Sequence, residues 1–172
     1  GICNAMILTI LRHGAAGEAA TDRLRELTGA GEDDIGFACH QFHEACENRG
    51  IPHPGLILHS PWVRTLQTAE IVAAAFTHAQ ISPVAALQPG SDEAAVDAVL
   101  GDITNSRSCP EHLLLVAHQP QATRLVDHYL GEPGSVPSLS PGGLATLSLQ
   151  APAAGCARLL FWAMPPEYEA GI

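Results

Sequence analysis

Short apolar runs alternate with amphipathic stretches along most of the chain. The amphipathic stretches predict helices over 28–48, 60–76, 92–103 and 120–130, and the apolar runs predict strands at 6–11, 55–59, 81–87 and 112–118. In the first helix, apolar side chains recur with the helical period at positions 35, 39, 42 and 46. The sequence Leu-Leu-Leu-Val-Ala at 113–117 is typical of a strand that is buried on both faces.

This alternation predicts an α/β fold with a mostly parallel central sheet flanked by helices. Two further apolar runs, 144–149 and 158–164, follow a loop rich in Gly, Pro and Ser and are predicted to pair as an antiparallel edge hairpin. Because we find no internal repeat or linker, residues 6–172 are predicted to form a single domain. We interpret residues 1–5, before Met6, as a cloning remnant and leave them out of the fold.

Polar residues mark where two of the helices begin. Thr28 is predicted to be the N-cap of the first helix. Ser60 is predicted to cap the second, with Pro61 at its first helical position.

Composition narrows the class of protein. The 172 residues are 47% hydrophobic and 15% charged, which is typical of a globular domain. The net charge of −10 argues against a broad surface for nucleic acid or for an anionic membrane. All eight basic residues are arginines, whose planar guanidinium groups suit phosphate and carboxylate oxygens.

The remaining compositional signals predict a cytoplasmic protein. No apolar run approaches the roughly 20 residues that a membrane-spanning helix needs. The first eleven residues carry no basic segment typical of a secretory signal. The five scattered cysteines suggest free thiols in a reducing compartment rather than a disulfide framework.

Candidate chemistry gathers where three predicted strands end. These ends read Arg-His-Gly at 12–14, His-Ser-Pro at 59–61 and His-Gln-Pro at 118–120, and Arg64 follows one turn after the second. Parallel sheets bind ligands in a crevice beyond the carboxyl ends of their strands. We therefore expect imidazole and guanidinium groups to meet in one crevice.

Each candidate also has a simpler interpretation. Arg64 lies in the first turn of a helix, where the helix dipole disfavours a cation unless an anion binds there. The simpler interpretation is that Arg64 is a solvated surface arginine. His13 can be a nucleophile, a base, a metal ligand or a core residue, and Gly14 after it permits a sharp turn and close approach of a ligand. The Ser60 hydroxyl can cap a helix, contact a phosphate, or do both. His59 is expected to point to the opposite face of its strand and to have a structural role.

A possible zinc set, Cys39, His43 and Cys46, lies on the first helix. Both cysteines also continue the apolar stripe of that helix, and buried free cysteine is common. The core interpretation is preferred, so no metal site is predicted.

Four motifs in order resemble the histidine phosphatase superfamily: LRHG at 11–14, DxxRxLT at 22–28, SPxxRxxQTAE at 60–70 and HQP at 118–120. The resemblance extends from Met6 to about Met164 and is closest to the short SixA-type phosphohistidine phosphatases. It implies a phosphoglycerate-mutase-like fold and a two-step phosphoryl transfer without metal or other cofactor.

The resemblance also implies roles for individual residues. His13 would be the nucleophile, Arg12 and Arg64 would clamp the phosphoryl oxygens, and His118 would donate a further hydrogen bond. The expected substrate-binding residues are Arg25 (with Arg23 as an alternative), Ser60, Gly14 and Gln119.

One departure from the superfamily concerns the acid that protonates a leaving alcohol. The corresponding stretch, 87–93, gives no secure assignment, although it contains Asp92 and Glu93. Phosphohistidine needs such an acid less, because imidazole can already be protonated near neutral pH (pKa about 6.5). The short gaps at 15–59 and 65–117 leave no room for a capping domain, so the crevice is expected to be open to a histidine on another protein.

The sequence therefore predicts a phosphohistidine phosphatase acting on a phosphorylated histidine domain of a signalling or phosphotransfer system, and binding phosphate-like oxyanions. One alternative is a small-molecule phosphomonoesterase of the same superfamily. Another is a non-catalytic phosphate-binding module.

Overall fold

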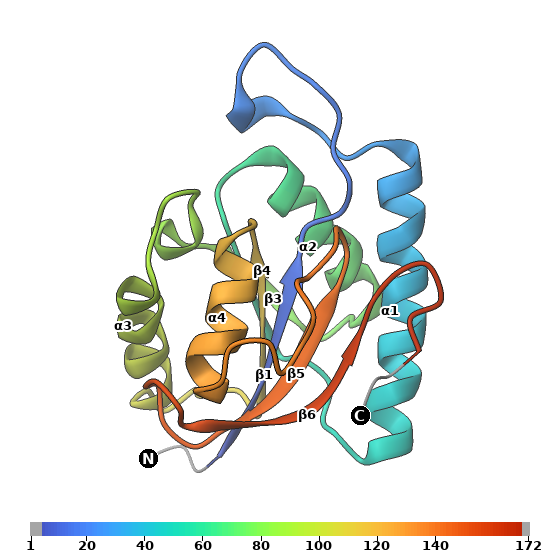
Figure 1. Ribbon diagram of the computed structural model, residues 1–172. Helices are drawn as coiled ribbons and strands as arrows, with labels where there is room; N and C mark the ends of the chain where they lie inside the picture. The colour runs from blue at the N-terminus through green and yellow to red at the C-terminus, as the bar shows by residue number, and fades with distance from the viewer. Residues whose placement is uncertain (1–4, 170–172) are drawn as a thin grey trace.

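The computed structural model describes residues 5–169 (Figure 1). The interpretation of residues 1–5 as a cloning remnant falls almost entirely outside this range. Strands and helices alternate along the described chain in the order β1 (Met6–Arg12), α1 (Gly29–Arg49), β2 (Leu56–His59), α2 (Val63–Ala75), β3 (Gln80–Pro83), α3 (Glu93–Thr104), β4 (His112–Ala117), α4 (Gln121–Leu130), β5 (Leu144–Leu149) and β6 (Ala157–Ala163). Two short 3₁₀ turns, Asp22–Leu24 and Ala85–Leu87, complete the set.

The strands form one six-stranded sheet in the order β3-β2-β4-β1-β5-β6. Strands β3, β2, β4 and β1 run parallel to one another. Strand β5 pairs antiparallel with β1, and β6 pairs antiparallel with β5. The mostly parallel sheet and the antiparallel edge hairpin are therefore confirmed.

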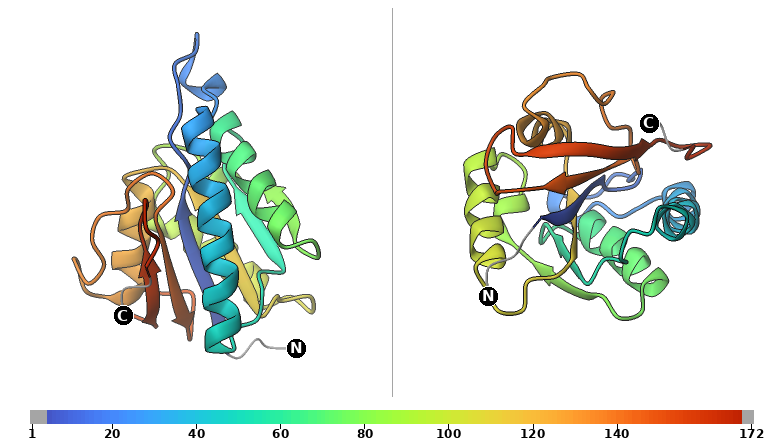
Figure 2. Two further views of the ribbon diagram at one scale, coloured as in Figure 1. Left: turned by 90° about the vertical axis from the view of Figure 1, so that its right-hand side faces the viewer. Right: turned by 90° about the horizontal axis from the view of Figure 1, so that it is seen from below.

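Helices cover both faces of the sheet (Figures 1 and 2). Because side chains alternate along a strand, β1 and β4 supply two cores at once. Leu8, Leu113 and Leu115 pack with α3 and α4, whereas Leu11 and Leu114 pack with α1 and α2. Every residue of β4 is buried, as its uninterrupted apolar run predicts.

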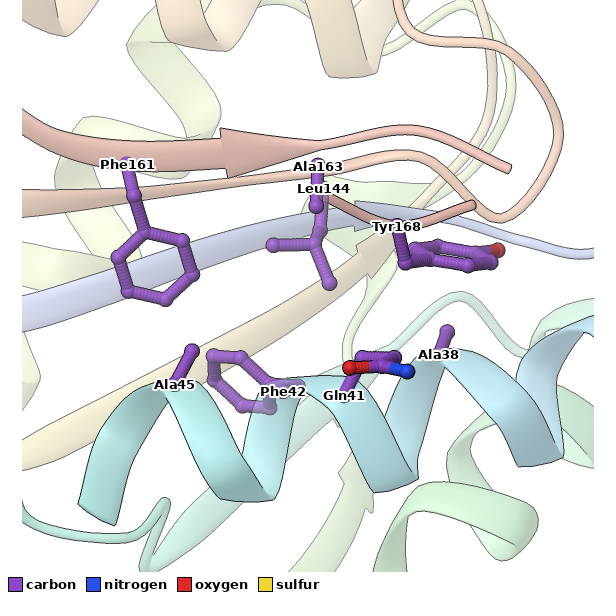
Figure 3. A pocket seen from close by; sticks show the side chains of 8 residues that line it. All are labelled: Ala38, Gln41, Phe42, Ala45, Leu144, Phe161, Ala163 and Tyr168. Carbon is purple, nitrogen blue, oxygen red and sulfur yellow. The ribbon is translucent and has the colours of Figure 1, made fainter. Parts of the chain in front are cut away.

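Helix α1 begins and ends as its sequence predicts. The Thr28 Oγ1 accepts a hydrogen bond from the Gly31 N–H at 2.9 Å, and Gly50 closes the helix in the left-handed conformation, with φ 65°. Figure 3 shows the buried face of α1, where Phe42 points toward Leu144 and Phe161 of the last two strands.

The cysteines differ in state. Cys39 and Cys46 are buried free thiols on α1, and Cys156 is a partly exposed free thiol. Cys109 is disulfide-bonded, so the expectation of free thiols is wrong at this position. No helix among residues 5–169 is long and apolar enough to cross a membrane.

Two predicted boundaries are wrong. Helix α2 begins at Val63 rather than at Ser60, because the Ser60 hydroxyl accepts the Trp62 N–H at 3.1 Å and is engaged before the helix starts. Strand β3 ends at Pro83 rather than at 87. The chain turns there, and the Leu87 N–H donates to the Val84 carbonyl at 3.3 Å.

Two glycines of α1 provide a matched test of this packing. A Cβ at Gly31 would lie 2.2 Å from the Ala15 carbonyl oxygen, whereas a Cβ at Gly36 would meet nothing within 4 Å in the described structure. We expect Gly31→Ala to lower the free energy of unfolding by roughly 1–3 kcal/mol, because the backbone must move. Gly36→Ala should raise it by about 0.5–1 kcal/mol through helix propensity. Urea denaturation measures both, and equal effects would contradict the close approach of α1 to Ala15.

Candidate active site

Three strand ends meet at one edge of the sheet. Strand β4 lies between β1 and β2, and all three run parallel. Their carboxyl ends lie at the upper edge of the sheet in Figure 1, and His13, Ser60 and His118 are the residues that directly follow them in the sequence. The segment between β1 and α1 rises above this edge.

His13 is held in one tautomer. Its Nδ1 lies 2.7 Å from the Gly14 carbonyl oxygen, which can only accept, so Nδ1 carries the proton and Nε2 keeps its lone pair. The pKa of His13 is lowered to about 4, mainly by burial and also by the charge of Arg64, against the opposing effect of the hydrogen bond to the Gly14 carbonyl. The side chain is therefore a neutral imidazole at pH 7, with Nε2 unprotonated.

Arg64 points at this nucleophilic atom. Its Nε donates to His13 Nε2 at 3.3 Å. Its Nη1 donates to the Asp22 carbonyl oxygen at 2.7 Å, and its Nη2 donates to the Asp22 carboxylate at 3.2 Å. With 6% of its side chain exposed, Arg64 is not a solvated arginine. The expected anion at this helix end is supplied, in this structure, by Asp22.

Asp22 is a site residue that sequence reasoning did not single out. Its carboxylate also accepts from Arg25 Nη1 at 3.2 Å. Partial burial raises the pKa of Asp22, but the hydrogen bonds from Arg25 and Arg64 outweigh it and hold the pKa below its usual value. The group is thus ionised at neutral pH. The sequence did contain a signal for this role: an acidic residue begins the motif at 22–28, which was otherwise expected to bind an anion through its arginines.

The segment that carries Asp22 is fastened to α2. The Leu27 N–H donates to Gln67 Oε1 at 2.8 Å, and Arg25 Nε donates to the Gly17 carbonyl oxygen at 2.8 Å. The first contact joins the motif at 22–28 to the motif at 60–70, and the second closes the segment between β1 and α1 on itself. Arg25 lies close enough for its charge to lower the pKa of His13.

His118 and Ser60 form the second part of the site. The His118 Nε2 lies 2.9 Å from Ser60 Oγ, and the His118 ring meets the His13 ring edge to face at 5.2 Å between centroids. Ser60 Oγ accepts from the Trp62 N–H and retains its own proton for donation to His118 Nε2; in that arrangement the ring proton of His118 lies on Nδ1. Burial lowers the pKa of His118 to about 3, with smaller contributions from His13 and Arg64.

Two buried nitrogens lack an acceptor. His118 Nδ1 and Arg12 Nε have no hydrogen-bond partner among residues 5–169. Arg12 is tied by its Nη1, which donates to the Leu139 carbonyl oxygen at 2.9 Å. Unpaired buried donors are costly, and an oxyanion supplies the acceptors they need.

Two predicted binding residues are engaged in packing or in other contacts. The Gln119 amide contacts Thr123, Ser138 and the Leu139 carbonyl, so it ties the 131–143 loop to α4, and its substrate contact stays a prediction. A Cβ at Gly14 would lie 2.9 Å from Ile35 Cγ1. Close packing against α1 therefore requires glycine at position 14. The sequence interpretation did not include this reason.

Neither candidate acid is aimed at His13. The Asp92 carboxylate caps α3 by accepting from the Ala95 N–H at 3.0 Å. The Glu93 carboxylate lies 3.3 Å from Arg124 Nε.

An aromatic contact beside the site was not revealed by the sequence. The Arg23 guanidinium lies over the Trp62 ring at 5.0 Å, and the Trp62 ring lies 6.2 Å from that of His118. Arg23 thus contacts Trp62, whereas Arg25 contacts Asp22.

The suspected zinc set on α1 is not assembled as Cys39, His43 and Cys46. Burial raises the pKa of both thiols to about 12, which opposes the thiolate form that binds metal. Among the described residues, His43 instead lies near Glu47 and His53.

The chain is similar to several proteins of known structure. No protein-family model matches it, and no curated protein sequence matches it. A putative phosphohistidine phosphatase SixA from Agrobacterium tumefaciens aligns with a TM-score of 0.74 and 23% identity, over 93% of this chain and 98% of the other. The protein histidine phosphatase SixA complexed with tungstate aligns with a TM-score of 0.74 and 25% identity, over 93% and 97%. The chain has the fold of the SixA phosphatases.

More distant neighbours share this fold. A putative phosphohistidine phosphatase SixA from Nakamurella multipartitia has a TM-score of 0.71 and 24% identity, over 96% of this chain and 99% of the other. A mycobacterial glucosyl-3-phosphoglycerate phosphatase has a TM-score of 0.64 and 17% identity, over 91% and 98%. The SixA-like fold expected from the motifs, of the phosphoglycerate-mutase-like class, is confirmed.

The buried histidines predict a pH dependence. A histidine has a pKa of about 6.5 in an unfolded chain, and His13 and His118 have lower values when folded. The unfolded chain therefore binds protons first, and stability falls as the pH drops from about 6.5 toward 4. We expect ¹⁵N NMR to show both rings neutral at pH 5.5. A ring that is protonated at pH 6 would contradict the burial described here.

Proposed function

We propose that this chain is a phosphohistidine phosphatase that removes the phosphoryl group from a histidine on a signalling or phosphotransfer protein. The observation that carries the proposal is the His13 Nε2 atom, unprotonated and 3.3 Å from the Arg64 guanidinium. A nucleophile with a free lone pair beside a fixed cation is what phosphoryl transfer requires.

In the first step, His13 Nε2 attacks the phosphorus atom. A new N–P bond forms as the N–P bond of the substrate breaks, and the released imidazole takes a proton from solvent. Arg64 and Arg12 offset the charge on the phosphoryl oxygens, and His118 Nδ1–H donates to one of them. The bond from His13 Nδ1–H to the Gly14 carbonyl stays in place and keeps the ring oriented.

In the second step, water attacks the phosphorus atom on His13. The N–P bond breaks, inorganic phosphate leaves, and Nε2 regains its lone pair. We propose that neither step requires a metal, because Arg12, Arg25 and Arg64 supply positive charge at the site. This electrostatic arrangement is a common source of rate enhancement in phosphoryl transfer.

The carboxylates support phosphohistidine as the substrate. Asp22 is kept ionised by Arg25 and Arg64, Asp92 caps a helix, and Glu93 pairs with Arg124. An alkoxide leaving group needs a proton from an acid, whereas the imidazole of phosphohistidine accepts one from water near neutral pH. The site therefore favours the leaving group that needs least help.

A small-molecule phosphomonoesterase is the second candidate. The observation in its favour is the fold shared with the mycobacterial glucosyl-3-phosphoglycerate phosphatase. A non-catalytic phosphate-binding module is less consistent with a His13 whose tautomer and orientation suit attack.

Turnover of two substrates, side by side, tests the proposal. We expect faster release of phosphate from a phosphorylated histidine domain than from a small phosphomonoester such as a phosphoglycerate. His13→Ala should lower turnover at least about a thousandfold, because the nucleophile is lost. His40→Ala, on the exposed face of α1, is the control and should retain full turnover.

Two outcomes would contradict the proposal. Faster turnover of the phosphomonoester would support the second candidate. Wild-type turnover by His13→Ala would show that the nucleophile lies elsewhere.

A further inference from the structure

Three side chains with metal-binding atoms converge at the C-terminal end of α1. His43 and Glu47 lie one helical turn apart, and His53 belongs to the connection between α1 and β2. Their ligand atoms all lie within 4.8 Å of one another. His53 precedes β2, so the cluster lies near the amino ends of the strands, at the opposite edge of the sheet from the crevice (Figure 1).

The two imidazole rings are supported by one aromatic residue. The rings of His43 and His53 lie 4.5 Å apart between centroids. Phe76, which is buried at the end of α2, stacks on His43 at 5.7 Å and meets His53 edge to face at 5.3 Å. This apolar support limits the orientations that both rings can adopt.

Hydrogen bonds fix the backbone immediately before His53. The Gly50 N–H reaches the Glu47 carbonyl at 3.3 Å, and the Ile51 N–H donates to the Cys46 carbonyl at 2.9 Å. The buried His112 donates through Nδ1 to the Pro52 carbonyl at 2.7 Å. The position of His53 relative to α1 is therefore set before any ligand arrives.

From this geometry we propose that His43, Glu47 and His53 bind a divalent transition-metal ion, with Zn²⁺ as the representative. Two imidazole nitrogens and one carboxylate oxygen suit Zn²⁺ and its neighbours, whereas Mg²⁺ and Ca²⁺ prefer all-oxygen sites. Ligand atoms around tetrahedral Zn²⁺ lie ~3.3 Å apart, given metal–nitrogen bonds of ~2.0–2.1 Å. Small rotations of these side chains are enough to reach that spacing.

The cluster also leaves room for a fourth ligand. His43 and His53 line a pocket of about 260 Å³ that His78 and Thr77 line as well. Water or the His78 ring can complete the coordination from this side.

Binding would replace an existing contact. His53 Nε2 now lies 2.7 Å from Glu47 Oε1, so a proton is shared between the atoms that the metal would join. Metal binding at Nε2 moves the ring proton of His53 to Nδ1 and ties the end of α1 to the connection that leads into β2. The site is structural and lies apart from the residues proposed for catalysis.

Zinc titration of the full chain, without an affinity tag and in a Cys156→Ser background, tests the proposal. Cys156 is a free and partly exposed thiol that would otherwise compete for the metal. Isothermal titration calorimetry should show one Zn²⁺ per chain, and Zn²⁺ should raise the melting temperature. His43→Ala, Glu47→Gln and His53→Ala should each weaken binding at least about tenfold.

The matched control lies on the same helix. His40 and Glu44 have the same spacing as His43 and Glu47, with 3.6 Å between Nε2 and Oε1, but belong to no group of three ligands among the described residues. His40→Ala and Glu44→Gln should leave zinc affinity unchanged, and EDTA should lower the melting temperature of the zinc-loaded protein without changing turnover. Zinc affinity that is equal in all five variants, or lost only with the His40 and Glu44 changes, would overturn the proposal.

Discussion

The site depends on a buried cation held against a neutral imidazole. Arg64 Nε meets His13 Nε2 at 3.3 Å, inside an edge of the sheet where a protonated His13 would face three arginines. Burial and these charges act in the same direction, and both keep the lone pair on Nε2. The guanidinium in turn needs an anion, which Asp22 supplies here. In the proposed reaction, the phosphoryl group would take over that role.

The fold supplies this arrangement through a few close contacts. Parallel pairing of β1, β4 and β2 brings the three strand ends together, so that His13 and His118 meet although they are far apart in sequence. Gly31 lets α1 approach the Ala15 carbonyl, two residues after His13. Gln67 and Arg64 of α2 then hold the segment that carries Asp22 and Arg25. The packing that builds the domain thus also orients the site.

Much of this could be predicted from the sequence, because hydrophobic periodicity reports on burial. The order of elements, the parallel sheet and the meeting of three strand ends follow from it. The start of α2 was mispredicted, since whether Ser60 caps a helix or bonds to His118 depends on tertiary contacts. Asp22 and the Trp62–Arg23 pair were missed for the same reason: their partners come from distant segments. The grouping of His43 with Glu47 and His53 was not considered, because His53 lies beyond the end of the helix.

The most direct test of the central claim is to locate the phosphate on the enzyme during turnover. A reaction quenched in alkali and examined by mass spectrometry and ³¹P NMR reports both the residue and the ring nitrogen. The account predicts an acid-labile phosphate on Nε2 of His13, because Nδ1 is engaged with the Gly14 carbonyl. The account would be contradicted by phosphate on Nδ1 of His13 or on another residue. It would also be contradicted if no residue carried phosphate although the kinetics showed a burst, which indicates that an intermediate accumulates.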